Sequence, residues 1–331
     1  MISDDAVKEL IEIALKEEQD IFLRQKSIKA GMLAFDDVPS VVFLPSQFFG
    51  AGMQVFSHYT PDHSFALPAE RAENLYADIR FLGDASFRAF LIKGKYKRII
   101  LPFAECALKG EYLYRASFSW LGEFRAECPY FVQLLALFPE CDYDFEELRS
   151  IFGSKAVCCL GRTDEPKLNV FEASYTKGKF CCVADEAEKL AWKKTAVYFN
   201  SRSETEEFGR FLDRRRVDFV LYDGNLSDEE KLRAFRRFNE NESPIVIATR
   251  SFIPETLFTD VEKSIFAGVP FSVSHIHRCC ASTSEIDVIY CPSDFERNER
   301  ISRSLSDTVG DSEIYTVRSK NLSEIQRLIK E

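Results

Sequence analysis

Residues 195–248 read TAVYFNSRSETEEFGRFLDRRRVDFVLYDGNLSDEEKLRAFRRFNENESPIVIA. Three apolar runs, at 195–199, 219–222 and 245–248, are each followed by turn residues and predict buried strands. Between them lie two stretches with helical spacing, 203–214 and 227–239, and the second opens with the capping-box pair Ser227 and Glu230. Buried strands that alternate with such helices are typical of βαβ units. This stretch therefore predicts a parallel sheet that helices cover on both faces.

The same alternation extends towards both ends of the chain. In the first half, an amphipathic helix over 7–15, with Ser3 and Asp4 as candidate caps, precedes a second short helix over 25–35. Further strands are expected at 41–44, 64–67, 87–91, 98–101, 156–160, 264–266, 287–290 and 313–317, with a last helix at 322–330. The segment 164–167, Asp-Glu-Pro-Lys, interrupts the pattern and predicts a domain boundary.

Length and composition limit the class of protein. The 331 residues suggest two domains of roughly 150 residues each, and 46% hydrophobic with 29% charged residues is an ordinary globular balance. No apolar run approaches the ~20 residues of a membrane-spanning helix, and no basic-then-apolar leader follows Met1. We therefore expect a cytoplasmic protein without a membrane partner. The net charge of −10 argues against nucleic-acid or membrane binding driven by overall charge alone.

Ten cysteines and four histidines raise the question of disulfides and metal sites. Six of the cysteines form adjacent pairs, Cys158-Cys159, Cys181-Cys182 and Cys279-Cys280. Structural or buried thiols are the favoured interpretation, because a reducing compartment is expected and no pair of Cys-x-x-Cys motifs occurs. The segment 275–280, His-Ile-His-Arg-Cys-Cys, leaves a metal site or redox chemistry open, since histidines two apart would point the same way on a strand. No metal ligand is assigned.

Residues 198–202, Tyr-Phe-Asn-Ser-Arg, resemble the Tyr-Cys-Asn-Ser-Arg that follows a strand in the second RecA-like domain of RecQ-family superfamily 2 DNA helicases. Residues 222–226, Tyr-Asp-Gly-Asn-Leu, resemble the family's Tyr-His-Ala-Gly-Leu, and 245–249, Ile-Val-Ile-Ala-Thr, fit its Val-Val-Ala-Thr. Family Phe, Phe, Val and Pro positions fall on Phe238, Phe252, Val261 and Pro270. Residue types, order and spacing agree throughout this part of the second half.

The first half follows the family order more loosely. Residues 42–46, Val-Phe-Leu-Pro-Ser, fall where the family has a strand that leads into its phosphate loop, and 99–105 resemble its strand-Ala-Pro-Glu segment. Residues 120–125, Trp-Leu-Gly-Glu-Phe-Arg, resemble Trp-Gly-His-Asp-Phe-Arg, the aromatic-rich loop that couples DNA to ATP. The resemblance implies an α/β fold of two tandem RecA-like (P-loop NTPase-type) domains, with parallel sheets flanked by helices. It implies a degenerate ATP-binding-like domain at 1–163, a linker at 164–170 and a helicase C-terminal-like domain at 171–331.

The phosphate-binding groups of the family are replaced in this chain. A Gly-rich loop normally binds the phosphates, its Lys neutralises their charge, and its Ser or Thr holds Mg²⁺. The resemblance places Gly50 at the Lys position and Ala51 at the hydroxyl position. Phe48 and Phe49 replace small residues, so the phosphate site is expected to be filled as well as uncharged.

Two further parts of the ATPase machinery are missing. The family's Asp-Glu-Ala-His, which binds Mg²⁺ and orients water, falls on residues 112–115, where Tyr112 and Leu113 replace the acidic pair. The two arginine fingers fall on Ser282 and Glu285. One arginine finger is worth about 10³–10⁵ in rate, so three losses that affect one reaction predict a pseudo-helicase without ATPase activity. No catalytic residue and no cofactor are assigned, and ATP and Mg²⁺ binding is expected to be lost.

The resemblance still offers candidates for nucleic-acid contact. In the family, backbone amides, hydroxyls and a few arginines hold nucleic acid across both domains. The corresponding residues are Trp120, Phe124, Arg125, Arg202, Thr249 and Arg250. Core packing beneath the first domain is the competing interpretation of Trp120 and Phe124. The arginine runs 214–216 and 236–237 lie among acidic residues, which favours a solvated mixed-charge surface over a binding patch.

Three functions remain open. The favoured one is an inactive helicase-like protein that binds single-stranded or duplex DNA weakly, or acts beside a DNA-processing protein partner, for example in DNA repair. The second is a protein–protein scaffold without nucleic-acid binding, suggested by 30 Phe and 12 Tyr residues that cannot all be buried. The third is an active ATP-dependent DNA helicase with a non-standard site.

Overall fold

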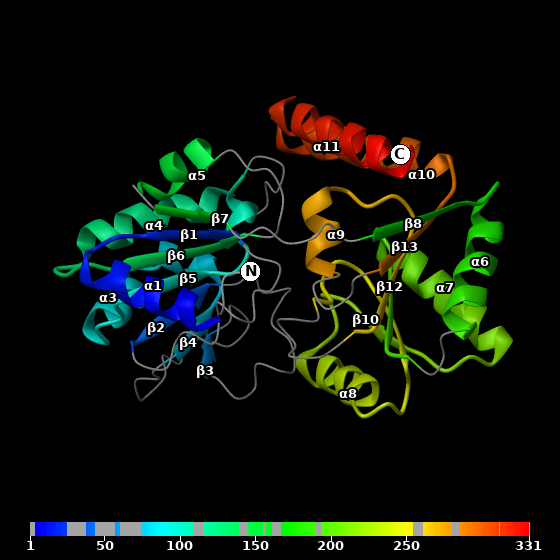
Figure 1. Cartoon of the computed structure of the whole chain (residues 1–331), viewed down its shortest axis with the longest axis horizontal. Helices are drawn as coiled ribbons and strands as arrows, with labels where there is room; N and C mark the ends of the chain where they lie inside the picture. Colours follow the sequence, from blue (N-terminus) through cyan, green and yellow to red (C-terminus); the bar gives the residue numbers. More distant parts are fainter. Residues whose placement is uncertain are drawn as a thin grey trace. The chain divides into compact units, whose positions relative to one another are not determined.

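The computed structural model describes residues 4–24, 38–43, 57–59, 74–108, 115–138, 145–154, 157–160, 167–189, 193–253, 261–279, 285–310 and 312–330. The chain divides into two compact units, and it passes from the first to the second between Thr163 and Asp164. Each unit is built around a parallel sheet with helices beside it (Figure 1).

In the described part of the first unit, seven parallel strands form one sheet with the order β3-β4-β2-β5-β6-β1-β7. The strands are β1 (Ile21–Arg24), β2 (Ser40–Phe43), β3 (Ser57–Tyr59), β4 (Asn74–Ala77), β5 (Arg98–Leu101), β6 (Gln133–Phe138) and β7 (Val157–Leu160). The helices are α1 (Asp4–Lys16), α3 (Ala85–Lys93), α4 (Arg115–Glu127) and α5 (Phe145–Phe152), with 3-10 helices η4 (Ile79–Gly83) and η5 (Ala104–Ala107). Strands β2, β5 and β6 are buried along their whole length, as expected for a sheet covered on both faces.

The strand predicted at 87–91 is wrong, because these residues lie in helix α3. Asp84 caps this helix, and its side chain accepts hydrogen bonds from the backbone N–H groups of Ser86 at 2.7 Å and Phe87 at 3.2 Å. Phe87 and Leu91 are four residues apart and fully buried, so they share the inner face of the helix. A short apolar run does not distinguish a strand from a buried helical turn, and here the cap decides.

In the described part of the second unit, six parallel strands form a sheet with the order β10-β11-β9-β12-β13-β8. The strands are β8 (Lys167–Glu172), β9 (Thr195–Tyr198), β10 (Val220–Tyr222), β11 (Ile245–Ala248), β12 (Lys263–Ala267) and β13 (Glu285–Tyr290). The helices are α6 (Thr176–Lys189), α7 (Arg202–Arg215), α8 (Asp228–Asn239), α9 (Val273–Cys279), α10 (Ser293–Val309) and α11 (Ser312–Lys330). The predicted capping box at the start of α8 is present, with Ser227 and Glu230 bonded reciprocally.

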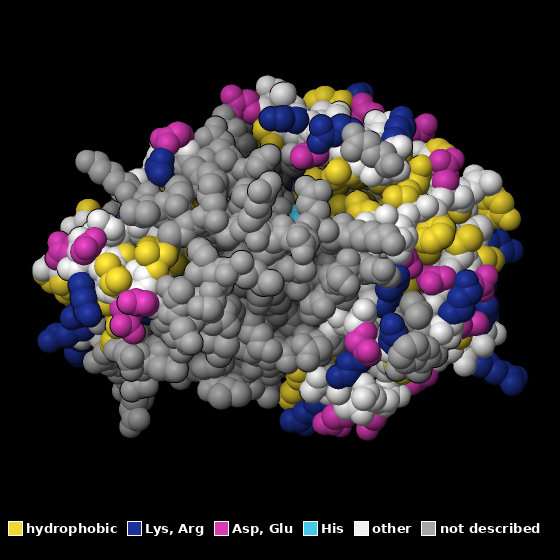
Figure 2. Space-filling view, viewed as in Figure 1, with side chains coloured by type: hydrophobic (Ala, Val, Ile, Leu, Met, Phe, Trp, Pro, Cys, Tyr) yellow, Lys and Arg dark blue, Asp and Glu magenta, His cyan; other side chains and the backbone are white. Residues whose placement is uncertain are grey.

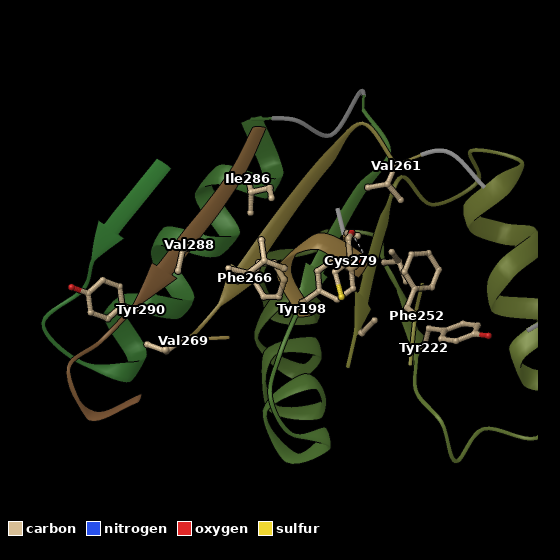
Figure 3. Packing of buried hydrophobic residues seen from close by; sticks show 14 of the residues in the cluster. Tyr198, Tyr222, Phe252, Val261, Phe266, Val269, Cys279, Ile286, Val288 and Tyr290 are labelled. Carbon is tan, nitrogen blue, oxygen red and sulfur yellow. Dashed lines mark hydrogen bonds between the residues drawn. The ribbon is translucent and has the colours of Figure 1, made fainter. Parts of the chain in front are cut away.

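Alternate residues of the second sheet enter two separate cores. On one face, Ala196 and Tyr198 of β9 pack with residues of α8, α9 and α11. Figure 3 shows labelled side chains of this cluster, among them Tyr198, Phe252, Phe266 and Cys279. On the other face, Val197 packs against α6 and α7. The Tyr198 hydroxyl donates a hydrogen bond to the Cys279 carbonyl oxygen at 3.0 Å, which ties β9 to α9.

Two predictions for the second half are wrong. The predicted linker at 164–170 is too long, because residues 167–170 belong to β8, which pairs with β13 at the edge of the sheet. The strand predicted at 313–317 lies in α11, where Ile314 is fully buried and the helix packs against α10. Five residues carry too little periodicity to separate a strand from a helix, so the partner helix decides.

The remaining expectations concern cysteines and membrane segments. Six cysteines with described side chains are free thiols: Cys106, Cys128, Cys181, Cys182, Cys279 and Cys291. Cys279 is buried as predicted, whereas Cys182 is exposed. None of the helices in the described ranges combines the length and the apolar character that crossing a bilayer requires. The helix predicted at 25–35 and the strand predicted at 64–67 lie outside the described residues.

Candidate functional site

The chain leaves strands β9 and β11 at neighbouring points of the second sheet. The two strands are adjacent and parallel, with Tyr198 paired with Ala248. The Phe199 N–H donates a hydrogen bond to the Ala248 carbonyl oxygen at 2.9 Å, so the pairing continues one residue beyond β9. Ligand sites of open α/β sheets form at the carboxyl ends of the strands. The turn that follows β9 and the residues that follow β11 are therefore placed together where such a site is expected.

Arg202 lies at the surface directly after β9. It is the first residue of α7, which Ser201 caps through its hydroxyl. The Arg202 side chain is exposed and makes no hydrogen bond or ion pair with other described residues. Its backbone carbonyl accepts a hydrogen bond from the Thr205 hydroxyl at 2.7 Å, which fixes the main chain beneath it. The guanidinium group is thus available to an anion from solution.

Thr249 and Arg250 directly follow β11 and are half-buried. The Thr249 and Ser251 hydroxyls are hydrogen-bonded to each other at 3.0 Å. Phe252 is fully buried below them, and its ring meets Tyr222 edge-on at a centroid distance of 5.2 Å. This aromatic anchor holds the segment to the core, so its hydroxyls and the Arg250 side chain have a defined place at the end of the sheet.

His275 and His277 lie in helix α9, not on a strand as the metal-site alternative required. Side chains two residues apart on a helix point in different directions, so the two imidazoles do not converge. His275 is buried edge-on against Phe266 at a centroid distance of 5.3 Å. Burial, and secondarily the positive charge of Arg250, lower the pKa of His275 to about 3. Within the described ranges no group of three or more metal-ligating side chains is found.

The candidates of the first unit are turned towards its interior. Residues 120–125 lie in helix α4, not in the aromatic-rich loop that the resemblance implied. Phe124 is 0% exposed, so its ring cannot stack on a base in this conformation. Trp120 is half-buried, and a Cβ built on Gly83 falls 2.8 Å from its ring. The competing interpretation as packing residues therefore accounts for the placement of both aromatic side chains.

Arg125 is engaged in an internal ion pair. Its Nη2 lies 2.9 Å and 2.8 Å from the two carboxylate oxygens of Asp20, which is buried, and its Nε donates to the Val132 carbonyl oxygen at 3.2 Å. Asp20 also accepts hydrogen bonds from the Leu134 N–H and the Ser154 hydroxyl. Arg125 therefore links α4 to strands β1 and β6, and contact with phosphate would require this network to open.

The positions where the family carries its ATPase groups fall mostly outside the described residues. These are Gly50, Ala51, Tyr112, Leu113 and Ser282, together with Phe48 and Phe49. Glu285 is the first residue of β13, and only its backbone is described. The expected loss of ATP and Mg²⁺ binding therefore rests on residue types.

The two arginine runs form mixed-charge surfaces, as the sequence favoured. Arg215 pairs with Asp185 and Glu188, with both ion pairs at 2.7 Å, and Arg237 pairs with Asp218 at 3.1 Å. On the face shown in Figure 2, basic and acidic side chains are interspersed over the described surface of the second unit.

Comparisons with known proteins show that the fold is similar to that of helicases. The helicase conserved C-terminal domain family matches residues 178–278. S. cerevisiae Dbp5 bound to RNA and ADP BeF3 is similar with a TM-score of 0.66 at 14% identity, over 92% of this chain and 89% of that one. The Mycobacterium smegmatis helicase Lhr bound to ssDNA and AMP-PNP gives 0.68 at 14% identity, over 88% of this chain and 46% of that one. The DEAD-box helicase Mss116 bound to ssRNA and UDP-BeF gives 0.65 at 15% identity, over 88% and 69%. No curated protein matches the chain.

The chain thus has two RecA-like domains in tandem, the fold of the helicases to which it is similar. The region that matches the helicase conserved C-terminal domain family, residues 178–278, contains Arg202, Thr249 and Arg250. The predicted fold class is confirmed. The similar structures do not single out the RecQ family, so that finer assignment stays a prediction.

Proposed function

We propose that this protein binds nucleic acid through the second RecA-like unit and does not hydrolyse ATP. The observation that carries the proposal is that Arg202 and the pair Thr249 and Arg250 follow two adjacent parallel strands, β9 and β11. Arginine guanidinium groups and hydroxyl groups are among the side-chain groups that usually hold a phosphate backbone. These contacts carry no base specificity by themselves, so single-stranded and duplex DNA, and RNA, are all acceptable ligands.

The comparisons support a nucleic-acid ligand in a general way. The similar structures are described as bound to RNA, in Dbp5, or to single-stranded nucleic acid, in Lhr and Mss116. At 14–15% identity they speak for the fold. The residues 198–202 and 245–249 remain the sequence support for a place near the RecQ helicases, and hence for DNA and a DNA-processing partner.

The proposed lack of ATPase activity depends on the residue types at the positions where the family carries its ATPase groups. Gly50 and Ala51 offer neither a cation for the phosphates nor a hydroxyl for Mg²⁺. Tyr112 and Leu113 supply no carboxylate, and Ser282 and Glu285 supply no arginine finger. Electrostatic stabilisation of the transferring phosphoryl group is the main source of catalysis in this fold, and these substitutions remove it.

Fluorescence anisotropy with a labelled 20-nucleotide single strand tests the binding half. Arg202→Ala is expected to raise the Kd about fivefold, the effect of roughly 1 kcal/mol of charge-assisted hydrogen bonding. It should also reduce the slope of log Kd against log salt by roughly 0.7, the value for one phosphate contact on a single strand. Arg214→Ala is the matched control, because Arg214 is exposed near the other end of α7. Equal effects of the two variants, or no binding at low salt, would contradict the proposal.

Titration with a fluorescent ATP analogue and Mg²⁺ tests the inactive half. We expect no saturable binding and no nucleic-acid-stimulated phosphate release. Micromolar affinity together with turnover would instead identify an active helicase with a non-standard site.

A protein–protein scaffold is the second candidate, and one observation favours it. Phe171 at the end of β8 and Tyr175 just before α6 are 48% and 63% exposed, high values for aromatic side chains. Co-purification from the native host with wild type and with the double variant Phe171→Ser, Tyr175→Ser tests this candidate. A partner that is lost only from the variant, in a protein that binds no nucleic acid, would favour the scaffold.

A further inference from the structure

The turn Asn200–Arg202, which we call the β9 turn, is held by two neighbouring residues of a helix almost a hundred residues further along the chain. Arg297 and Asn298 of α10, the α10 pair, bond to this turn and to the segment after β12. Neither residue was singled out in the sequence, because no spacing connects residue 200 with residue 298.

Asn298 fixes the start of the β9 turn. Its Nδ2 donates to the Val269 carbonyl oxygen at 2.8 Å, and its Oδ1 accepts from Asn200 Nδ2 at 3.1 Å. Asn200 also donates to the same Val269 carbonyl at 2.6 Å. Asn298 is 1% exposed, so this amide pair is sheltered from water and locks the ends of β9 and β12 together.

Arg297 fixes the end of the β9 turn. Its Nη1 lies 2.6 Å from Glu204 Oε1, and its Nη2 donates to the Ser201 hydroxyl at 3.3 Å. Ser201 caps α7, and its hydroxyl also donates to Glu204 Oε2 at 3.0 Å. The guanidinium group therefore holds the cap and the first turn of α7 at once.

A buried ion network supports the α10 pair from below. Lys179 of α6 is 0% exposed and donates to both carboxylate oxygens of Asp294 at 2.9 and 3.0 Å, and it lies 3.5 Å from Glu204. With Arg297, the network has two positive and two negative groups. Gly268 beside this network adopts φ +141°, a backbone conformation that residues with a side chain rarely adopt.

The side chains of the β9 turn thus divide into two kinds. The side chains of Asn200 and Ser201 form internal hydrogen bonds, whereas the Arg202 side chain makes no described polar contact. Holding the main chain on both sides of an arginine reduces the conformational entropy that is lost when it binds a phosphate.

We propose that Arg297 and Asn298 are positioning residues that hold the β9 turn so that Arg202 is presented to a nucleic-acid phosphate, an inference that rests on the proposed function. The pair acts through the turn and does not itself touch the ligand. The Arg297 guanidinium is paired with Glu204, so Arg202 is the positive side chain of this region that would bind the phosphate.

Arg297→Met tests this inference, with Arg300→Met as the matched control. Met keeps most of the stem of Arg297 and loses both contacts, whereas Arg300 lies exposed on the same helix and makes no described polar contact. Arg297→Lys retains a cation for Glu204 but lacks the second nitrogen that reaches Ser201. Its effects on hydrogen exchange and on the Kd should therefore lie between those of wild type and of Arg297→Met.

The first readout is hydrogen exchange, which needs no ligand. In Arg297→Met, peptides that cover residues 199–208 should exchange about tenfold faster, because the local opening of the first turn of α7 becomes easier. Peptides from α8 should be unchanged in the same sample, and Arg300→Met should behave as wild type. Unchanged exchange at residues 199–208 would show that the pair does not hold the turn.

The second readout is affinity for the labelled 20-nucleotide strand. Arg297→Met should raise the Kd about threefold. The double variant Arg202→Ala, Arg297→Met should bind no more weakly than Arg202→Ala alone, because Arg297 is expected to affect binding only through the position of Arg202. Additive losses would make Arg297 a direct contact and would overturn the positioning role. If the wild type binds the strand and Arg297→Met binds it with the same Kd, the positioning role is overturned as well. Failure of the wild type to bind, with the exchange effect present, would instead reject the proposed function.

Discussion

Helix α4 in the first unit and the β9 turn in the second each present an arginine beside buried aromatic residues. In α4, Arg125 follows the fully buried Phe124, and its guanidinium is bonded to the buried Asp20. In the β9 turn, Arg202 is exposed, and the internal pairing is made by Arg297 from α10. In both regions an arginine pairs with a buried carboxylate. In α4 that arginine is the candidate Arg125 itself, whereas beside the β9 turn it is Arg297, which comes from a helix far along the chain.

This difference shows what separates a supporting arginine from a contact arginine. A buried carboxylate needs a positive partner, because an unpaired charge in the interior is costly. Where the candidate arginine itself pairs with that carboxylate, as Arg125 pairs with Asp20, it is lost to the ligand. Where another helix supplies the partner, as α10 does for Glu204, the arginine on the turn stays free for an anion.

Phe124→Ala should give the largest effect and tests whether α4 is structural. Phe124 is 0% exposed, and removal of a fully buried phenyl ring costs about 3–5 kcal/mol of unfolding free energy. We expect a marked fall in the midpoint of urea or thermal unfolding, with no specific change in nucleic-acid affinity of the folded fraction. A variant of wild-type stability that binds weakly would restore Phe124 as a contact.

Gly122→Ala is the control for that substitution. Gly122 lies in the same helix, is exposed, and a Cβ there meets nothing within 4 Å. Replacement of an exposed helical glycine with alanine should raise stability by roughly 0.5–1 kcal/mol. A loss of stability would mean that this surface of α4 is covered in the folded protein.

Lys179→Met tests the support beneath the β9 turn. The substitution leaves Asp294 and Glu204 with less positive charge in a buried place, and removal of one partner of a buried pair costs about 3 kcal/mol. Lys177→Met, on the exposed face of the same helix, should change the unfolding free energy by less than about 0.5 kcal/mol. Equal unfolding midpoints for the two variants would argue against a supporting role of the network.

The last prediction is a pH dependence of stability that arises from His275. Its folded-state pKa of about 3 is below the value of about 6.5 expected when unfolded, so the unfolded chain binds the proton more readily. Stability should therefore be complete above pH 6.5 and decline by about 1.4 kcal/mol per pH unit as the pH falls towards 3. His275→Phe should remove that part of the slope in thermal unfolding measured between pH 5 and 7.5. Parallel pH profiles for wild type and variant would show that His275 is not held neutral.

The elements that the sequence predicted well are those with local signals. Strands at 98–101 and 245–248 agree with β5 and β11, and the Ser227–Glu230 capping box starts α8 as expected. The errors at 87–91 and 313–317 concern short apolar stretches whose conformation is set by a cap or by a packed neighbour. Of the candidate site, the resemblance to the helicase family selected Arg202, Thr249 and Arg250.

The sequence by itself determined the alternation of buried strands and helices, and with it the expectation of parallel sheets covered by helices. Only the tertiary structure decided which arginine faces water. That outcome depends on bonds between residues far apart in the chain, such as Asp20 with Arg125 and Glu204 with Arg297. Periodicity and spacing are local properties, whereas the pairing of a buried charge is settled by whichever partner the fold brings within a few ångströms.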